Sequence, residues 1–322
     1  MMDNHFREFI LSSMQGLFSF CVNNVSDSTI SRLSGELSQS LDHSDSTNYI
    51  DSPENALSAA LAVSSLLDGL GDTTEYISTN VTIDIAKETL GIITSKLGAI
   101  LRAGQCDRVR GLYVIIDPEV TAGRDPLTIA RGAVAGGARV LQLRDKLRDK
   151  GEIMPLATEL KNLCQDNNVL LIINDHVDMA AALGTDNVGV HVGQTDLSVA
   201  DSCSILHESQ LIGRSNREIP LLIESQEMGA DHVAFGAIYP TTTKPGGIGY
   251  RGNQGPDRVK EARFVTNVPL VCIGGINADN VAPVVEAGAD AICVAAAIGL
   301  ADDPEAEAKK LVEAIRSAGG PV

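Results

Sequence analysis

From Gly111 to its end, the sequence alternates short runs of apolar, often β-branched residues with longer amphipathic segments, and this alternation constrains the fold more than any other feature. The apolar runs predict eight strands, at residues 112–116, 140–143, 170–173, 188–190, 211–213, 232–235, 270–273 and 291–294. Helical spacing predicts helices at residues 126–135, 153–167, 177–183, 199–208, 218–228, 278–287 and 304–317. Eight strand–helix units within roughly 210 residues predict a (βα)₈ TIM barrel, an α/β fold.

An open, doubly wound α/β sheet would give a similar alternation. Its nucleotide-binding versions carry a G-x-G-x-x-G fingerprint after the first strand, and this sequence has none there. The closed barrel is therefore the favoured interpretation. Asn277 and Asp303 directly precede predicted helices, where we expect their side chains to serve as N-caps.

The first 108 residues have a different character. Ser, Thr, Asn and Asp are frequent there, and apolar residues fall at helical spacing in 6–22, 56–70 and 81–101. We therefore expect two parts: a helical N-terminal region at 1–108, for which the sequence indicates no role, and the barrel domain at 109–322.

The formal net charge of −17 excludes a general binding surface for nucleic acid or an anionic membrane, because both need a basic footprint. No apolar run of about 20 residues predicts a transmembrane helix, and the apolar stretch at 9–22 lacks the basic region that begins a signal peptide. A cytoplasmic location is expected. The six cysteines form no C-x-x-C pair, so buried free thiols are expected rather than a zinc or disulfide framework.

In a barrel of this kind, the residues at the carboxyl ends of the strands face the functional site. The second predicted strand runs into Gln142, Arg144 and Lys146, which alternate with Leu143 and Asp145. Alternate side chains of a strand share a face, so the amide and the two cations are expected to point into the barrel mouth, where they would suit a polyphosphate. The alternative is a solvated loop with an ion pair to Asp145.

Carboxylates follow the next two strands. Asn174 and Asp175 end the third strand, and Asp196 follows the fourth. Two carboxylates, together with phosphate oxygens and water, form a typical Mg²⁺ site. The alternatives are a turn or helix cap at Asn174–Asp175 and a cap before Leu197 at Asp196. His191 is either an orienting hydrogen-bond donor or a structural histidine.

Later strand ends carry hydroxyls and glycines. Ser215 ends the fifth strand, and the sixth leads into Thr241, Thr242, Thr243 and Lys244, followed by Gly-Gly. This segment predicts a mobile loop that closes over anions, the alternative being a polar surface loop. After strands seven and eight, Gly275, Ala295 and Ala296 can offer backbone N–H groups to a phosphate.

Taken in order, these motifs resemble those of the thiamine-phosphate synthase family over residues 111–317: Gln-Leu-Arg-Asp-Lys, Asn-Asp, His-Val-Gly-Gln-Thr-Asp, Gly-Arg-Ser, Pro-Thr-Thr-Thr-Lys and Gly-Gly-Ile. The resemblance implies an Mg²⁺-dependent transferase of thiamine biosynthesis. Such an enzyme joins an aminopyrimidine-methyl diphosphate to a thiazole phosphate and releases diphosphate. These two phosphorylated small molecules are the partners that the resemblance implies. It leaves open whether the chain forms a homo-oligomer.

The resemblance also implies roles for the residues of the site. The pyrimidine diphosphate would be bound by Gln142, Leu143, Arg144, Asp145, Lys146, Asn174, Ser215 and Lys244, with Arg144, Lys146, Ser215 and Lys244 as catalytic residues. Asp175 and Asp196 would hold Mg²⁺. The thiazole phosphate would be bound by Thr241, Thr242, Thr243, Gly275, Ala295 and Ala296. Some family members have Ser in place of Ala296, so that one side-chain contact is missing here.

Two other functions would use part of the same set of residues. A thiazole tautomerase shares the barrel and the phosphate site but needs neither diphosphate nor metal. A non-catalytic barrel would bind a phosphate ligand under the control of the N-terminal helices. The cationic residues Arg144, Lys146 and Lys244 and the acidic pair Asp175 and Asp196 are all retained, which favours the synthase.

Overall fold

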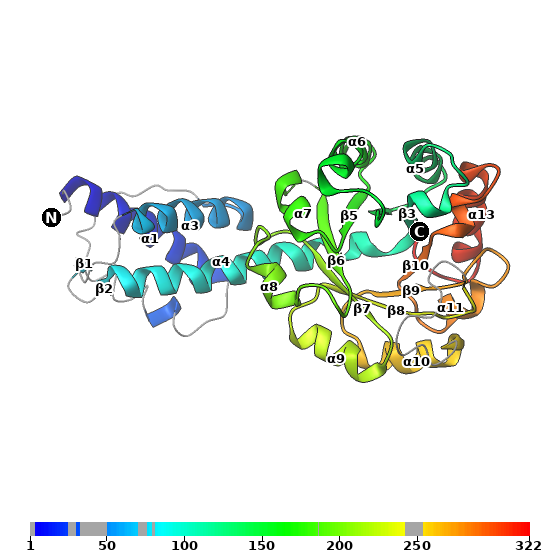
Figure 1. The fold of residues 1–322 in the computed structure, drawn as a ribbon. Coiled ribbons are helices and arrows are strands. Elements are labelled where there is room, and N and C mark those ends of the chain that lie inside the picture. The colour runs from blue at the N-terminus through cyan, green and yellow to red at the C-terminus, as the bar shows by residue number, and fades with distance from the viewer. Residues whose placement is uncertain are drawn as a thin grey trace. The chain divides into compact units, whose positions relative to one another are not determined.

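The computed structural model describes residues 4–24, 30–32, 50–69, 76–78, 81–185, 187–241 and 254–322. The chain forms two compact units, Met1–Leu101 and Arg102–Val322 (Figure 1). The composition of the sequence places the boundary a few residues later, between 108 and 109. Helix α4 (Ile83–Gln105) runs across the division, so its last residues belong to the second unit.

The N-terminal unit is mainly helical, as its spacing of apolar residues predicts. It contains α1 (Asn4–Asn24), α3 (Pro53–Asp68) and most of α4, with a short antiparallel pair of strands, β1 (Tyr76–Ser78) and β2 (Val81–Thr82). Helix α3 begins earlier than predicted because Ser52 caps it, accepting a hydrogen bond from the Asn55 N–H. The unit has its own apolar core, drawn from all three helices and including Ile10, Met14, Leu57, Leu90 and Leu97.

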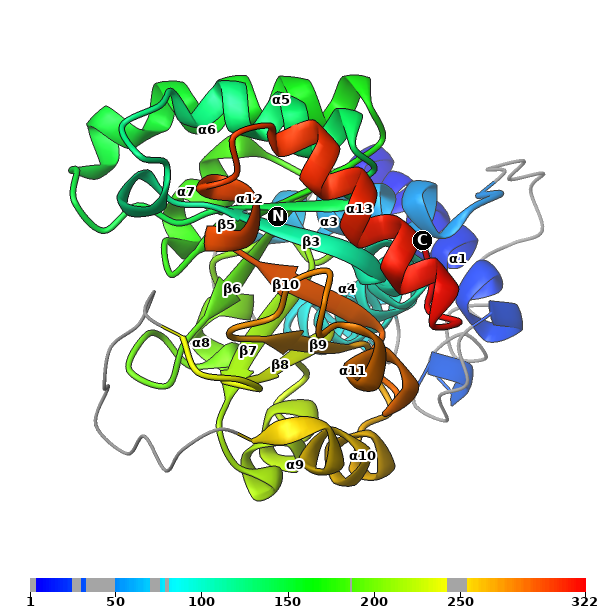
Figure 2. The same cartoon turned by 90° about the vertical axis from the view of Figure 1, so that its right-hand side faces the viewer.

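The second unit is a closed barrel of eight parallel strands, which confirms the predicted fold class (Figure 2). The strands are β3 (Gly111–Ile116), β4 (Val140–Leu143), β5 (Leu170–Asn174), β6 (Val188–Val192), β7 (Ile212–Asn216), β8 (His232–Gly236), β9 (Leu270–Ile273) and β10 (Ala291–Val294). Pairing of β10 with β3 closes the ring. Strands β5 to β8 extend one to three residues beyond their predicted ends, because the polar residues that follow the apolar runs continue the ladder.

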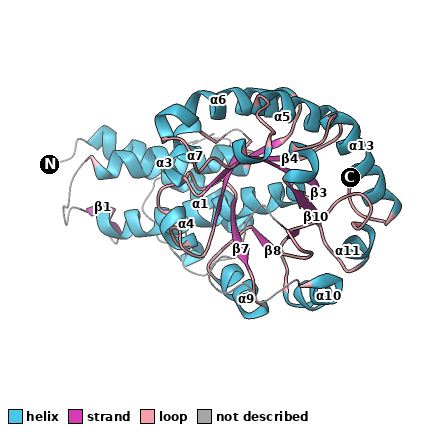
Figure 3. Cartoon of the chain, turned by 45° about the vertical axis from the view of Figure 1, so that its right-hand side comes forward, coloured by secondary structure: helices cyan, strands magenta, loops and turns pink. Residues whose placement is uncertain are grey.

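Helices surround the strands on the outside (Figure 3). They are α5 (Pro126–Ala135), α6 (Lys150–Asp166), α7 (Val177–Leu183), α8 (Val199–Cys203), α9 (Ile219–Glu227), α10 (Gly255–Val265), α11 (Ala282–Glu286), α12 (Ala296–Gly299) and α13 (Pro304–Ser317), with short 3₁₀ turns η1 (Cys106–Val109) and η2 (Pro118–Val120). The predicted N-cap Asp303 is confirmed, since its carboxylate accepts from two N–H groups of the first turn of α13. The predicted N-cap Asn277 is wrong: the chain first makes a turn, and α11 begins only at Ala282.

Two layers of side chains fill the barrel domain. Outward-facing strand residues pack against the helices in one large core. Inward-facing residues form a second core within the barrel, which includes Tyr113, Leu170, Leu211, Val271 and Ala291. All six cysteines are free thiols, and four of them are buried. Among the helices that the structure describes, none is long and apolar enough to cross a membrane.

Candidate functional site

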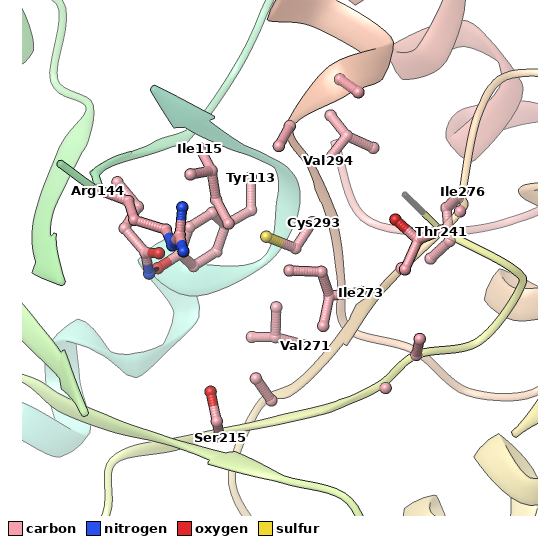
Figure 4. A pocket seen from close by; sticks show the side chains of 18 of the residues that line it. Tyr113, Ile115, Arg144, Ser215, Thr241, Val271, Ile273, Ile276, Cys293 and Val294 are labelled. Carbon is pink, nitrogen blue, oxygen red and sulfur yellow. Dashed lines mark hydrogen bonds between the residues drawn. The ribbon is translucent and has the colours of Figure 1, made fainter. Parts of the chain in front are cut away.

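A cavity of about 960 Å³ opens at the carboxyl ends of the barrel strands. Its lining comes from all eight strands, from Tyr113 on β3 to Val294 on β10. Figure 4 shows Arg144 and Tyr113 on one side of this cavity and Thr241 and Ile276 on the opposite side. The volume is that of a site for small molecules.

The cationic wall of the cavity is built around Arg144. Its side chain is 10% exposed and forms an ion pair with Asp117, whose side chain is 1% exposed. Parallel pairing sets Ile116 beside Leu143 and so brings the two following residues together. The Nε atom of Arg144 is buried and has no partner among the described residues, which leaves a donor for a ligand. Sequence reasoning missed Asp117, because Asp-Pro after a strand looks like an ordinary turn.

The neighbours of Arg144 have separate tasks. Gln142 faces inward and donates from Nε2 to the Tyr113 hydroxyl over 2.6 Å. Leu143 faces outward into the core, which leaves only its main chain to meet a ligand. Asp145 is buried and accepts from the N–H groups of Leu147 and Arg148 and from the Arg148 guanidinium. The ion pair of Asp145 that the alternative interpretation assumed is thus made with Arg148, whereas Arg144 pairs with Asp117.

Two carboxylates stand next to each other beside Asn174, which lines the cavity. Lys146 pairs with Asp175 over 2.8 Å, and Asp196 accepts from the Gly193 N–H over 2.8 Å. Burial and the nearby Asp175 carboxylate raise the pKa of Asp196. Neither acid caps a helix, since the N-cap of α8 is Ser198 and that of α7 is His176.

The chemistry of this pair fits a divalent cation. Two adjacent acids repel each other when ionised, and a bound cation removes the repulsion. Within the described ranges no group of three or more acidic, histidine or cysteine side chains could hold a metal by itself. Mg²⁺ needs only one or two carboxylates when substrate phosphates and water complete its shell, so Asp175 and Asp196 suit it.

A line of hydrogen bonds runs from the interior of the barrel to the cavity. His232 on β8 is fully buried, and its Nε2 lies 3.2 Å from Nδ1 of His191 on β6. The two rings stack, with centroids 5.3 Å apart. Nε2 of His191 lies 2.9 Å from Oγ of Ser215, whose side chain lines the cavity. Burial and the neighbouring His191 lower the pKa of His232 well below 6.5, so His232 is neutral.

The opposite wall is a cup of backbone groups after β9 and β10. Gly275, Ala295 and Ala296 all line the cavity there. Asn280, which sequence reasoning missed, holds this loop: its Nδ2 donates to the Gly275 carbonyl and its Oδ1 accepts from the Asn277 N–H, both over 2.9 Å. Thr241 lines the cavity beside the cup, whereas Thr242, Thr243 and Lys244 lie outside the described residues.

Comparison with known proteins gives one consistent family. A family model for thiamine monophosphate synthase matches residues 112–298. The thiamine-phosphate synthase of Natronomonas pharaonis is 40% identical over 205 residues, covering 64% of this chain and 94% of that protein. That of Thioalkalivibrio sulfidiphilus is 40% identical over 207 residues, covering 64% and 95%. A solved thiamine phosphate pyrophosphorylase from Pyrococcus furiosus is 27% identical, with a TM-score of 0.59 over 66% of this chain and 98% of that one.

Proposed function

The chain belongs to the thiamine monophosphate synthase family, and we propose how its cavity makes thiamine phosphate in thiamine biosynthesis. As a transferase, it joins 4-amino-2-methyl-5-(diphosphomethyl)pyrimidine to 4-methyl-5-(2-phosphoethyl)thiazole and releases diphosphate. The observation that carries this assignment is that one cavity has two walls suited to anions, one cationic and one made of backbone groups. A barrel that only binds one phosphate ligand would not need both.

The pyrimidine diphosphate is assigned to the cationic wall. Arg144 has a buried Nε free of partners among the described residues, and Asn174 and Ser215 line the same part of the cavity. Gln142 also lines the cavity, where its amide can face the pyrimidine. Lys146 and Lys244 are assigned to the remaining positive charge. Leu143 and Asp145 belong to the same segment as Arg144, and Asp145 shapes the turn of that segment by accepting two backbone N–H groups.

Asp175 and Asp196 are assigned to Mg²⁺ because they are adjacent and mutually destabilising as a bare pair. When bound, the ion neutralises charge on the diphosphate. A thiazole tautomerase has no diphosphate to neutralise, so the pair of acids favours the synthase over that alternative.

The thiazole phosphate is assigned to the cup. Backbone N–H groups at Gly275, Ala295 and Ala296 can donate to it, and Thr241 lies beside them with Thr242 and Thr243 next in sequence. Glycine at 275 allows close approach to the backbone. The missing hydroxyl at Ala296 leaves these main-chain donors in place.

Positive charge beside the diphosphate then supplies the main catalytic effect. Arg144, Lys146 and Lys244 neutralise the charge that grows on the departing diphosphate, and Ser215 donates a hydrogen bond to it. The electron-rich pyrimidine can support the methylene cation left behind, which the thiazole nitrogen attacks. That nitrogen carries no proton, so the bond-forming step needs no general base. Because the thiazole captures the cation directly, no covalent enzyme intermediate forms.

The test is to incubate the purified full chain with both substrates, with Mg²⁺ or with a chelator, and to measure thiamine phosphate and diphosphate together. We expect equal amounts of both products only when Mg²⁺ and both substrates are present. Absence of product with substrates that a known synthase converts would refute the proposal. Turnover that persists in the chelator would refute the role of the metal.

A further inference from the structure

We propose that the buried His232, acting through His191, holds the Ser215 hydroxyl with its hydrogen directed into the cavity. Ser215 then serves as a fixed hydrogen-bond donor to an anion, and His232 is a positioning residue that acts on the ligand only through His191 and Ser215. The anion is the diphosphate of the proposed function, and on that function the inference rests.

His232 itself lines no part of the cavity, so its effect on a ligand is indirect.

The direction of the hydrogen bonds follows from the one atom in the line that has no partner. Nδ1 of His232 is buried and has no hydrogen-bond partner among the described residues. A neutral imidazole carries its proton on one nitrogen only. A buried N–H without a partner is rarer in proteins than an unpaired acceptor, so Nδ1 is the bare nitrogen and Nε2 carries the proton.

The remaining protons are then fixed in turn. Nε2–H of His232 donates to Nδ1 of His191, which must be the bare nitrogen of that ring. The proton of His191 is therefore on Nε2, and it donates to Oγ of Ser215. Since Oγ accepts this bond, its own hydrogen is available for the cavity, which the Ser215 side chain lines (Figure 4). The opposite set of tautomers would spend the hydroxyl hydrogen on His191 and turn lone pairs toward the anion.

The barrel interior is shaped for this pair of rings. Gly213 on β7 lies between them, and a Cβ atom at that position would overlap both Nε2 of His232 and Nδ1 of His191. His232 is fully buried and His191 is 6% exposed, so water does not compete for their contact. The hydrogen bond between the two rings therefore depends on the absence of a side chain at Gly213.

The protonation pattern can be measured directly on the full-length protein. A long-range proton–nitrogen correlation spectrum of ¹⁵N-histidine protein distinguishes bare from protonated ring nitrogens. Single His→Gln variants assign the signals of the six histidines. We expect Nε2–H and bare Nδ1 in both His191 and His232. A proton on Nδ1 of His232 would overturn the inference, and this measurement requires no substrate or turnover.

Variants test the consequence for anion binding. His232→Met replaces the imidazole by an apolar side chain of similar length and so removes the donor. His232→Gln retains an amide N–H near the position of Nε2. With Mg²⁺ present, we expect His232→Met to weaken binding of inorganic diphosphate by about three- to tenfold in calorimetry, as befits part of one hydrogen bond to a charged group. His232→Gln should bind within about twofold of the wild type.

A double-mutant cycle separates positioning from general disturbance. In a Ser215→Ala background, His232→Met should cause no further loss of diphosphate affinity, because the hydroxyl it positions is gone. An undiminished loss in that background, or wild-type affinity in His232→Met alone, would overturn the inference. If the tautomers and the cycle are as expected but no thiamine phosphate forms, the proposed function fails and the positioning role does not.

Discussion

An alanine in place of Gly275 should damage the phosphate cup in a way that can be separated from its effect on the backbone. Gly275 has φ of +66°, a conformation that costs other residues about 1–2 kcal/mol. A methyl group there would also overlap the Pro240 carbonyl oxygen and lie 2.8 Å from Cβ of Tyr239. Both neighbours belong to the segment that leads from β8 to Thr241, so relief of the overlap moves that segment.

Gly229 provides the matched control. Its φ is +90°, yet nothing lies within 4 Å of a Cβ built on it. Gly229→Ala should therefore lose only the backbone contribution of about 1–2 kcal/mol. Gly275→Ala should lose a further amount of about 1–3 kcal/mol, the usual cost of overpacking.

Calorimetric melting and steady-state kinetics measure the two consequences. The barrel transition is identified as the one that Mg²⁺ and diphosphate shift upward. In it, Gly275→Ala should melt roughly 2–12 °C below Gly229→Ala, since about 1 kcal/mol corresponds to about 2–4 °C for a unit of this size. The KM for the thiazole phosphate should rise about tenfold or more in Gly275→Ala alone, equivalent to about 1.4 kcal/mol.

The KM for the pyrimidine diphosphate should stay within about threefold of the wild type in both variants, because its assigned wall lies across the cavity. Equal melting temperatures for the two variants, with an unchanged KM for the thiazole phosphate, would refute the reasoning. That result would show that the segment at Tyr239 and Pro240 yields without cost and that the cup does not depend on it.

Four further predictions concern other parts of the chain. Asp175→Asn should lower Mg²⁺-dependent turnover by about 100-fold or more, whereas Asp178→Asn, in an exposed ion pair on α7, should not; rates over an Mg²⁺ titration test this, and a wild-type rate in the first variant would contradict it. Deletion of residues 1–101 should leave kcat/KM within about threefold, because the described residues that line the cavity all belong to the second unit; a tenfold loss would count against this. Gly91→Ala in α4 should stabilise the N-terminal unit by about 1 kcal/mol and so raise its melting temperature, because alanine favours a helix over glycine and nothing lies within 4 Å of the added methyl. A lower melting temperature would contradict this. As the pH falls below 6.5, His232 binds a proton in the unfolded chain but stays neutral in the folded protein, so the free energy of unfolding should fall by up to about 1.4 kcal/mol per pH unit. Urea midpoints measured against pH should fall less steeply in His232→Gln, and equal slopes in the two proteins would refute this prediction.

Much of the barrel could be predicted because its strands are buried on both faces. Runs such as 270–273 and 291–294 are continuous apolar segments and match β9 and β10 residue for residue. Helix α10 (Gly255–Val265) was not predicted, because its polar sequence has only two buried residues, Val259 and Ala262, and shows little periodicity. Its place is set by contacts with neighbouring helices rather than by its own pattern.

The candidate site likewise contains residues that could be assigned from the sequence and residues that could not. Residues that follow directly from a strand end, such as Arg144 and Asn174, could be assigned to the cavity because strand alternation fixes the direction of their side chains. Asp117 and Asn280 could not, because each acts on a partner that only the pairing of β3 with β4 or a loop brings near. The sequence left two interpretations of His191, and the contacts with His232 and Ser215 were needed to decide between them.

The absence of a side chain at Gly213 restricts which substitutions can be accepted there during evolution. Any larger residue at that position would occupy the space in which the two imidazoles meet, so it could be accepted only together with a different side chain at 232. The two positions should therefore covary among related barrels, with histidine at 232 confined to chains that have glycine at 213. A set of sequences that combines alanine at the first with histidine at the second would show that the interior can make room by another route.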